Sequence, residues 1–123
     1  MVNLWRAYWE LLILEYPLLR QNFAAIYKRV QNTRVGTLHP QDVTADQICR
    51  AVDLAAALYF KQSLCLQRSA AAACLLKRFG FPAEMVVGVQ QVPFLAHAWV
   101  ELDGRVVNDK PYMSDIYMVL SRC

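Results

Sequence analysis

The chain has 123 residues, of which 57% are hydrophobic and 19% are charged, and its formal net charge is +3. This length and composition predict one compact domain with a substantial core and exclude a disordered tail. Because the basic residues are scattered and form no long run, we expect no nucleic-acid partner.

The N-terminal segment does not resemble a signal peptide. Glu10 and Glu15 interrupt its apolar stretch, and no small-residue cleavage site follows. No run of the sequence reaches the roughly 18 apolar residues that a membrane span needs. We therefore expect a cytoplasmic protein with reduced cysteines, and peripheral association with a membrane stays open.

The first helical region, residues 3–30, is rich in aromatic side chains, and Pro17 is expected to break or kink it into two pieces. Helical spacing predicts a core-facing apolar stripe with a charged end. Its members are Leu4, Tyr8, Leu11, Leu12 and Glu15. A second interpretation stays open, in which Trp5, Tyr8 and Trp9 form a docking face for a partner protein or the membrane surface.

A polar loop is expected over residues 31–43, where His39 precedes a proline and is predicted to be exposed and without a catalytic role. The next helix is expected to begin at Thr44, because Thr44 and Gln47 have the spacing of a capping box. The residues predicted to face the core are Ile48, Val52, Ala55 and either Leu58 or Tyr59.

The strongest predicted helix begins near Cys65, contains four consecutive alanines and ends at Gly80. Cys65 therefore lies beside unpaired backbone N–H groups and the positive end of the helix dipole, which favour a thiolate. Cys49 and Cys74 fall in helix interiors and are predicted to be core residues, and Cys123 is expected to fray. The cysteines lack the spacing of zinc ligands, so we expect no metal and no cofactor.

Short β-strands are expected after this helix. They cover residues 85–89, 97–102 and 105–109, with a loop over 90–96. Residues 110–123 are expected to form either another strand or a short helix. Helices followed by an antiparallel sheet predict an α+β domain.

The last two predicted strands form a hairpin around Asp103 and Gly104, and its register decides whether His97 can contact Asp109. A two-residue turn would direct Asp109 to the face of the sheet opposite His97. A three-residue loop, with Gly104 in the left-handed conformation of a bulge, would instead pair His97 with Asp109. A cysteine nucleophile needs a base, and the base needs an orienting group. A Cys65–His97–Asp109 triad is therefore predicted to require the bulged turn.

The segments CLQRSAAAACLLKRFGFPAEMVVGVQ and AHAWVELDGRVVND resemble the transglutaminase-like, papain-like cysteine peptidases that remove the leader in lasso-peptide biosynthesis. The resemblance covers roughly residues 60–110. It rests on a cysteine that opens a helix, on KRFGFPAE before a strand, and on HAWVE followed by an aspartate. The spacing is 32 residues from Cys65 to His97 and 12 from His97 to Asp109.

The resemblance implies that Cys65 is the nucleophile, that His97 is the base that later protonates the leaving amine, and that Asp109 orients His97. It also implies cleavage at the junction of leader and core, with a threonine expected next to last in the leader. Gln62 is a candidate oxyanion donor, and Asp115 is the alternative orienting acid.

The chain has no room for the winged-helix-like leader-binding domain of longer, fused members, so it resembles the split type. The resemblance therefore implies three partners: the lasso precursor peptide, a separate leader-recognition protein and an ATP-dependent macrocyclase. We expect a single peptidase domain, with a helical N-terminal extension over residues 1–45 and a catalytic core over residues 46–123.

Two alternatives to a peptidase stay open. The same triad with an amine acceptor would make a transglutaminase or acyltransferase, and a non-catalytic module would dock precursor and cyclase together. A metal-binding role is disfavoured, because two histidines and dispersed cysteines form no recognisable ligand set. Within the hairpin, Glu101 and Arg105 are expected to form a solvent-facing pair, and Asp103 to serve the turn.

Overall fold

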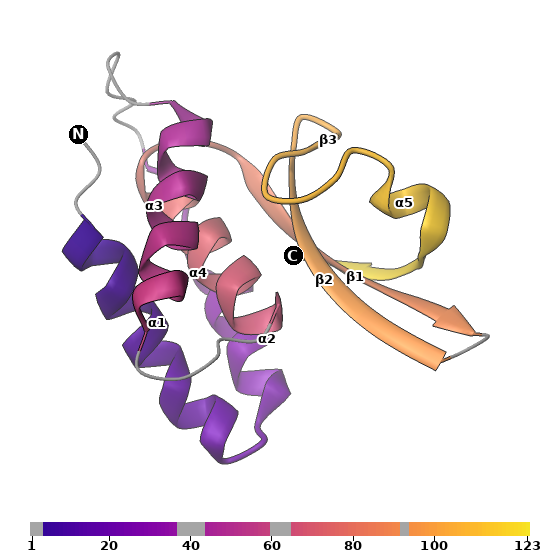
Figure 1. Cartoon of the computed structure of the whole chain (residues 1–123), viewed down its shortest axis with the longest axis horizontal. Helices are drawn as coiled ribbons and strands as arrows, with labels where there is room; N and C mark the ends of the chain where they lie inside the picture. The colour runs from indigo at the N-terminus through magenta and orange to yellow at the C-terminus, as the bar shows by residue number, and fades with distance from the viewer. Residues whose placement is uncertain (1–3, 37–43, 60–64, 92–93) are drawn as a thin grey trace.

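The computed structural model describes residues 4–36, 44–59, 65–91 and 94–123, which form an α+β structure of two layers. Helices α1 to α4 form one layer, and the described strands form a four-stranded antiparallel sheet that is the other layer. The short helix α5 lies on the side of the sheet away from the helical layer (Figure 1). The predicted fold class is confirmed.

The helical layer begins with a region that is divided in two, as predicted, although the break does not fall at Pro17. Helix α1 continues through Pro17 to Leu19. It ends where Gln21 adopts a left-handed φ of 55° and two backbone hydrogen bonds close the turn. The left-handed residue, rather than the proline, therefore ends the helix. The helices of this layer are α1 (Leu4–Leu19), α2 (Phe23–Asn32), α3 (Ala45–Leu58) and α4 (Cys65–Arg78).

The apolar stripe predicted for α1 is partly wrong. Leu11 and Glu15 are buried, whereas Leu12 lies at the surface and Tyr8 is only half-buried. The other buried residues of α1 are Ala7, Glu10, Leu14 and Leu18. The buried face is therefore rotated from the predicted one, and it contains two carboxylates.

Partners from other helices satisfy these two buried carboxylates. Glu10 pairs with Arg29 of α2 at 2.9 Å and with Arg78 of α4 at 2.6 Å. Glu15 accepts a hydrogen bond of 2.9 Å from the hydroxyl of Tyr59, which follows α3. A buried charge is tolerated when it is paired and hydrogen-bonded, so these contacts join α1 to the rest of the layer.

The sequence signals at the ends of α3 and α4 are confirmed. Thr44 and Gln47 form the capping box, with reciprocal hydrogen bonds of 3.2 Å. Gly80 follows α4 with a φ of 92°, where two backbone hydrogen bonds close the turn. At the last core position of α3, Tyr59 is buried and Leu58 is exposed.

The strand order of the sheet is β3-β2-β1-β4. Part of the loop predicted over residues 90–96 is strand, because Gln91 pairs with Phe94 across β1 and β2. Residues 110–123, for which helix and strand were alternatives, contain both. The elements of this half are β1 (Ala83–Gln91), β2 (Phe94–Leu102), β3 (Arg105–Val106), α5 (Met113–Ile116) and β4 (Met118–Arg122).

Helix α4 occupies the centre of the molecule, in contact with α1, α2, α3, β1 and β2. Residues 69–77 are all buried, and Ala70 to Ala73 are at most 1% exposed. Alanine side chains are short, so the neighbouring helices and the sheet approach the backbone of α4 closely. The alanine run therefore determines how near the two layers lie.

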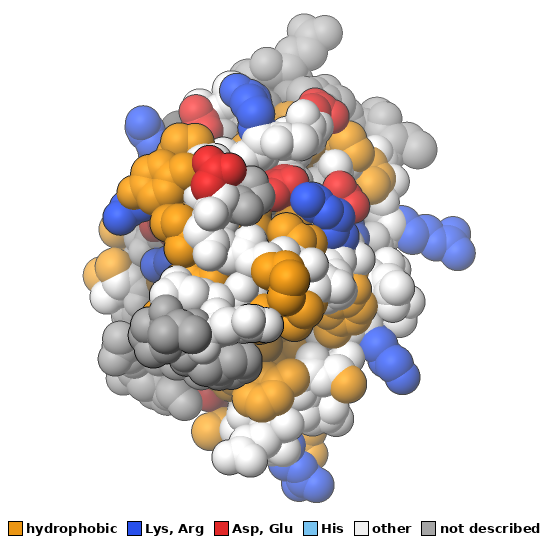
Figure 2. Space-filling model, turned by 90° about the vertical axis from the view of Figure 1, so that its right-hand side faces the viewer, with side chains coloured by type: hydrophobic (Ala, Val, Ile, Leu, Met, Phe, Trp, Pro, Cys, Tyr) orange, Lys and Arg blue, Asp and Glu red, His pale blue; other side chains and the backbone are white. Residues whose placement is uncertain are grey.

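The two faces of the sheet belong to separate clusters. Met85 and Val100 join the main core on the side of the helices. On the other side, Val86, Trp99 and Met113 form a small cluster, to which α5 contributes Met113. Figure 2 views the molecule from the side of the sheet and shows apolar side chains spread among polar ones.

The N-terminal helices share one core with the later elements, because the main cluster contains residues from α1 through β2. The division into an extension over residues 1–45 and a catalytic core over residues 46–123 stays a prediction. None of the helices in the described ranges is long and apolar enough to span a bilayer.

We expect Gly88→Ala to destabilise the protein by about 1–3 kcal/mol, because the added methyl group would overpack the small cluster. Its Cβ would lie 2.8 Å from the Trp99 ring and 2.9 Å from Cβ of Tyr117. Urea denaturation measures the loss, and the near-ultraviolet circular dichroism of Trp99 should change with it.

Gly104→Ala is the control for this substitution. A Cβ at Gly104 meets nothing within 4 Å, so its φ of +80° is the source of strain and the spectrum of Trp99 should not change. A Gly88→Ala protein with the stability and spectrum of the wild type would contradict the packing.

Candidate active site

Cys65 is the first residue of α4, and its side chain is half-buried. The first N–H groups of a helix lack partners within the helix, so a thiol there lies beside donors that the helix itself does not pair. Burial raises the pKa of Cys49 to about 12, that of Cys123 to about 11, and that of Cys74 as well. Cys49 and Cys74 are core residues, as predicted. Cys123 does not fray, because its amide donates to the carbonyl of Met85 at 2.9 Å.

The turn of the hairpin differs from the predicted one. Asp103 and Gly104 form a two-residue turn with φ values of 53° and 80°. Two left-handed residues are typical of the type I′ turn that Asp-Gly favours, so the turn role of Asp103 is confirmed. The bulged register is wrong, and so is the expectation that a tight turn would separate His97 from Asp109.

Asp109 reaches His97 because β3 is only two residues long. After β3, the amide of Val107 still donates to the carbonyl of Val100 at 2.9 Å. The amide of Val100, however, donates to the side-chain Oδ1 of Asn108 at 2.7 Å, where a regular ladder would use a main-chain carbonyl. Because the chain leaves the strand here, side-chain alternation no longer determines where Asp109 points.

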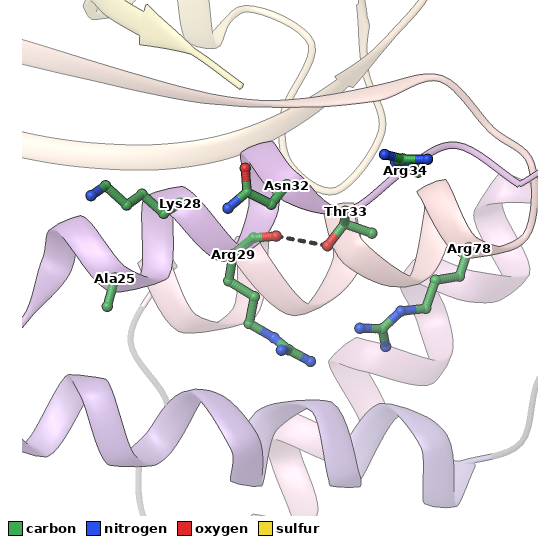
Figure 3. Close-up of a pocket in the computed structure, with 7 residues that line it drawn as sticks. All are labelled: Ala25, Lys28, Arg29, Asn32, Thr33, Arg34 and Arg78. Atoms are coloured by element: carbon green, nitrogen blue, oxygen red, sulfur yellow. Dashed lines mark hydrogen bonds between the residues drawn. The ribbon is translucent and has the colours of Figure 1, made fainter.

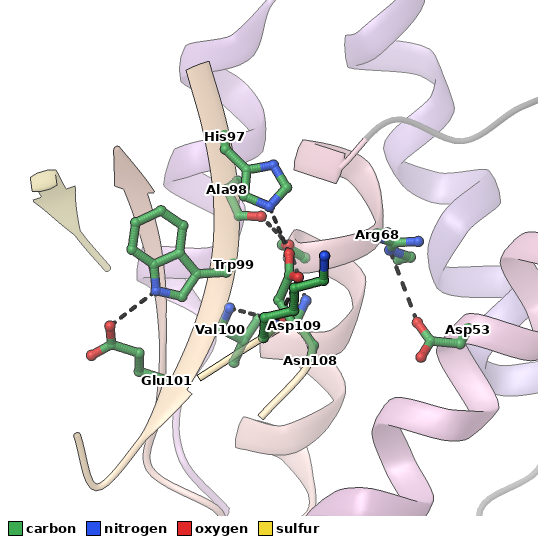
Figure 4. Close-up of polar contacts among 11 residues, drawn as sticks. Asp53, Arg68, His97, Ala98, Trp99, Val100, Glu101, Asn108 and Asp109 are labelled. Atoms are coloured by element: carbon green, nitrogen blue, oxygen red, sulfur yellow. Dashed lines mark hydrogen bonds and ion pairs between the residues drawn. The ribbon is translucent and has the colours of Figure 1, made fainter. Parts of the chain in front are cut away.

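His97 and Asp109 form the polar centre of the site, with 2.6 Å between His97 Nε2 and Asp109 Oδ2 (Figure 4). Their side chains are 21% and 19% exposed. Burial raises the pKa of Asp109, but hydrogen bonds from His97 and from the Lys110 amide, with the charge of Arg68, hold it below its usual value. An ionised carboxylate accepts hydrogen bonds and donates none. Nε2 of His97 therefore carries a proton, and Nδ1 is left to accept one.

Aromatic rings fix the plane of the His97 imidazole. Its ring stacks with Tyr117 at a centroid distance of 5.3 Å and with Trp99 at 6.1 Å. Trp99 is fully buried, so it gives the imidazole a rigid neighbour. The orientation of His97 thus has an apolar support in addition to Asp109.

Glu101 supports Trp99, and its partner is Arg122 rather than Arg105. The carboxylate accepts hydrogen bonds from Trp99 Nε1 at 2.9 Å and from Arg122 at 2.6 Å. Burial raises the pKa of Glu101, but these two hydrogen bonds outweigh burial and hold the pKa below its usual value. The predicted solvent-facing pair is wrong, because β4 returns beside β1 and brings Arg122 to a buried Glu101.

The helix that begins at Cys65 is held against β2 beside His97. Ser69, one turn later on the same face of α4, donates from Oγ to the carbonyl of Ala98 at 3.0 Å. No hydrogen bond joins Cys65 to His97, and Nδ1 of His97 has no hydrogen-bond partner among the described residues. The structure thus joins His97 to Asp109 and brings the Cys65 helix next to them, without joining thiol and imidazole.

Arg68 lies close to two carboxylates in the first turns of α4. Its Nε is 3.9 Å from Oδ1 of Asp53, and its charge also lowers the pKa of Asp109. Burial raises the pKa of Asp53, Arg68 opposes this rise, and the charge of Asp109 adds to it. Arg68 therefore offsets the repulsion between Asp53 and Asp109.

Two other predicted site residues do not enter this geometry. Gln62 lies outside the described residues, so the role of Gln62 as an oxyanion donor stays a prediction. His39 also lies outside the described residues. Asp115 is exposed in α5, and the carboxylate that binds His97 is that of Asp109.

Ser69 and Asn108 are polar residues of the site that the sequence analysis missed. Asn108 Nδ2 donates to Ser69 Oγ at 3.1 Å, so the segment after β3 is tied to α4. A signal existed in the sequence: Ser69 stands four residues after Cys65, on the same helix face, and Asn108 directly precedes Asp109.

The candidate docking residues on α1 differ in exposure. Trp5 and Trp9 are 76% and 63% exposed, whereas Tyr8 is half-buried and contacts the Tyr59 ring at 5.2 Å. A pocket of about 370 Å³ lies beside them, lined by Leu4, Trp5, Tyr8 and Leu58. The docking face itself stays a prediction.

A basic pocket of about 670 Å³ lies between α2 and the C-terminal end of α4 (Figure 3). Arg29 and Arg78 point toward one another because both bind the buried Glu10. Lys28 and Arg34 add further positive charge. Because this end of α4 is opposite the end that carries the cysteine, the pocket is separate from the triad residues.

Comparison with known proteins gives a family match and one relative. The model of the transglutaminase-like superfamily matches residues 11–122. The chain is also similar to the microcin J25-processing protein McjB of Escherichia coli, with 40% identity over 60 residues. That alignment covers 49% of the chain and 29% of the relative, so the matched stretch is less than a third of the relative's length. No solved structure gives a significant match. These matches confirm the transglutaminase-like resemblance.

We expect the free energy of unfolding to fall between about pH 7 and about pH 3, in part because Asp109 is protonated. The folded state lowers the pKa of Asp109, so its contribution is present above the pKa of the unfolded chain and is lost as the pH falls through the folded value. Asp109→Asn should therefore reduce the loss of stability on acidification. Urea denaturation of both proteins at pH 7 and at pH 3 measures this loss, and the free energy of unfolding at pH 7 is the reference for each protein. Equal losses in the two proteins would contradict the assignment.

Proposed function

The chain belongs to the transglutaminase-like superfamily, and on this premise we propose that it is a cytoplasmic cysteine peptidase that removes the leader from a lasso-peptide precursor. Cys65 is the nucleophile, His97 is the base, and Asp109 orients His97. The similarity to a microcin-processing protein supports a peptide substrate.

The observation that carries the proposal is the 2.6 Å contact between His97 Nε2 and Asp109. A carboxylate on Nε2 fixes the tautomer and leaves Nδ1 to exchange a proton with a nucleophile. Cys65 is the nucleophile available, because it opens the helix that is tied to β2 beside His97. Among the described residues Nδ1 of His97 has no hydrogen-bond partner. A positioned base whose second nitrogen can accept a proton is the arrangement that activation of a thiol requires.

The first half of the reaction transfers the leader to the enzyme. The Cys65 thiol gives its proton to His97 Nδ1, and the thiolate attacks the carbonyl carbon of the last leader residue. N–H groups at the start of α4 are donors for the tetrahedral oxyanion. As the C–N bond breaks, the imidazolium protonates the departing core amine. The leader is then a thioester on Cys65.

The second half releases the leader. His97 Nδ1 takes a proton from water as the water oxygen attacks the thioester carbonyl, and the proton then returns to the sulfur of Cys65. The leader departs with a new carboxylate. Asp109 stabilises the imidazolium in both halves, and its lowered pKa keeps it ionised at neutral pH.

Three partners belong to this proposal. A separate leader-recognition protein brings the precursor to the peptidase, and a threonine is expected next to last in the leader. An ATP-dependent macrocyclase then uses the freed core amine. Trp5, Tyr8 and Trp9 are the candidate contact with the recognition protein.

The reaction is tested by mass spectrometry of a lasso-type precursor incubated with the protein, with and without the leader-recognition protein. We expect one cut, at the junction of leader and core. Cys65→Ala removes the nucleophile and should leave no cut. His97→Ala and Asp109→Asn should lower kcat by roughly a thousandfold or more, because the base or its orientation is lost.

Cys123→Ser is the matched control, because burial keeps this thiol protonated, and it should cut like the wild type. A product whose mass matches an added amine would instead indicate acyl transfer. Full cleavage by Cys65→Ala would contradict the triad. No cut by the wild type in the presence of the leader-recognition protein would favour a non-catalytic scaffold.

The docking face predicts a second set of variants. Trp5→Ala and Trp9→Ala should each raise the Kd for the leader-recognition protein by roughly tenfold or more, because exposed aromatic residues are common binding anchors. Isothermal titration calorimetry measures the Kd. Tyr16→Ala is the control, since Tyr16 is 68% exposed on the same helix but was not among the docking candidates. Unchanged affinity in both tryptophan variants would contradict this surface.

A further inference from the structure

We propose that Ser69 and Asn108 are positioning residues, which set where Cys65 lies relative to the pair of His97 and Asp109. This inference rests on the triad of the proposed function and adds the contacts that align it. The hydrogen bond from Asn108 to Ser69, here called the Ser69–Asn108 link, joins α4 to the segment after β3.

The link is part of a continuous set of hydrogen bonds. Asn108 Oδ1 accepts from the amide of Val100 at 2.7 Å, and Asn108 Nδ2 donates to Ser69 Oγ at 3.1 Å. Ser69 Oγ in turn donates to the carbonyl of Ala98 at 3.0 Å. Ser69 is 1% exposed, so water does not compete for its hydroxyl group. Helix α4, strand β2 and the segment after β3 are therefore fixed to one another at one point.

Each residue that takes part in these hydrogen bonds at the link lies close in sequence to a member of the triad. Ser69 lies four residues after Cys65 and on the same face of the helix. Ala98 directly follows His97, and Asn108 directly precedes Asp109. A shift of any one element at the link would therefore move one member of the triad relative to the other two.

The residue types fit this role. An asparagine side chain both accepts and donates, so Asn108 can bind a backbone amide and a hydroxyl at the same time. A serine hydroxyl likewise accepts one bond and donates another. The link also explains how β3 can end early, because Asn108 replaces the main-chain acceptor that Val100 would otherwise need.

Proton transfer between Cys65 and His97 depends on this alignment. A general base must come within hydrogen-bond reach of the proton that it removes. The structure contains no bond between the two side chains, so their separation depends on the elements that carry them. A displacement of about 1 Å at such a site lowers the rate by about a hundredfold.

The test measures alkylation of Cys65 by iodoacetamide as a function of pH, with peptide mapping to separate Cys65 from the other cysteines. The thiolate reacts and the thiol does not, so the profile reports how far His97 favours the thiolate. His97→Ala supplies the profile of an uncoupled thiol. Because no peptide substrate is involved, the result does not depend on the proposed reaction.

The informative variants are Ser69→Ala and Asn108→Asp. Alanine is a strong helix former, so Ser69→Ala keeps α4 while it removes the hydroxyl. Asn108→Asp keeps the acceptor for the Val100 amide and replaces the donor to Ser69 with a carboxylate oxygen. We expect each to lower the His97-dependent alkylation rate by about tenfold or more, and the double variant to lower it no further. In the cleavage assay, kcat should fall and KM should not change.

Thr33→Val is the matched control, since its hydroxyl donates to the carbonyl of Arg29 and takes no part in the link. It should lose stability in urea but keep the wild-type alkylation profile. Folded Ser69→Ala and Asn108→Asp proteins with the wild-type profile would overturn the positioning role and leave the proposed function intact. A wild-type profile equal to that of His97→Ala would contradict the triad itself, and the positioning role with it.

Discussion

Helix α4 packs closely between the other helices and the sheet, and this packing sets the spacing of both layers. Ala70 to Ala73 are buried, and larger side chains there would force the two layers apart. Cys65 stands at the start of this helix, and His97 stands on the strand packed beside it. The same small side chains that close the core therefore also determine how near the thiol lies to the imidazole.

Buried polar contacts hold the helices in place around α4. Glu10 joins α1 to both α2 and α4, because it pairs with Arg29 and with Arg78. The ammonium group of Lys77 donates to the carbonyls of Val30 and Cys123 at 2.7 and 3.0 Å, so α4 is also tied to α2 and to the end of the chain. Removal of one partner would leave a buried charge without compensation. These contacts make the helical layer a stable base for the residues at the opposite end of α4.

The contact between His97 and Asp109 depends on the early end of strand β3. A longer β3 in the observed register would alternate its side chains and direct Asp109 away from His97. Because β3 ends after Val106 and the Asn108 side chain takes over the bond to Val100, Asp109 is free to turn toward the imidazole. The irregular segment is thus a requirement of the site.

The features that could be predicted from the sequence are those that depend on residues close together in the chain. The capping box at Thr44, the end of α4 at Gly80, the Asp103 turn and the position of Cys65 at a helix start each follow from a few neighbouring residues. Other features depend on how the elements pack: the burial of Glu10 and Glu15, the pairing of Glu101 with Arg122, the contact between His97 and Asp109, and the link between Ser69 and Asn108. Each of these depends on a partner more than ten residues away or on where a strand stops pairing. A local sequence pattern cannot report the partner that satisfies a buried polar group, because packing brings that partner from another element.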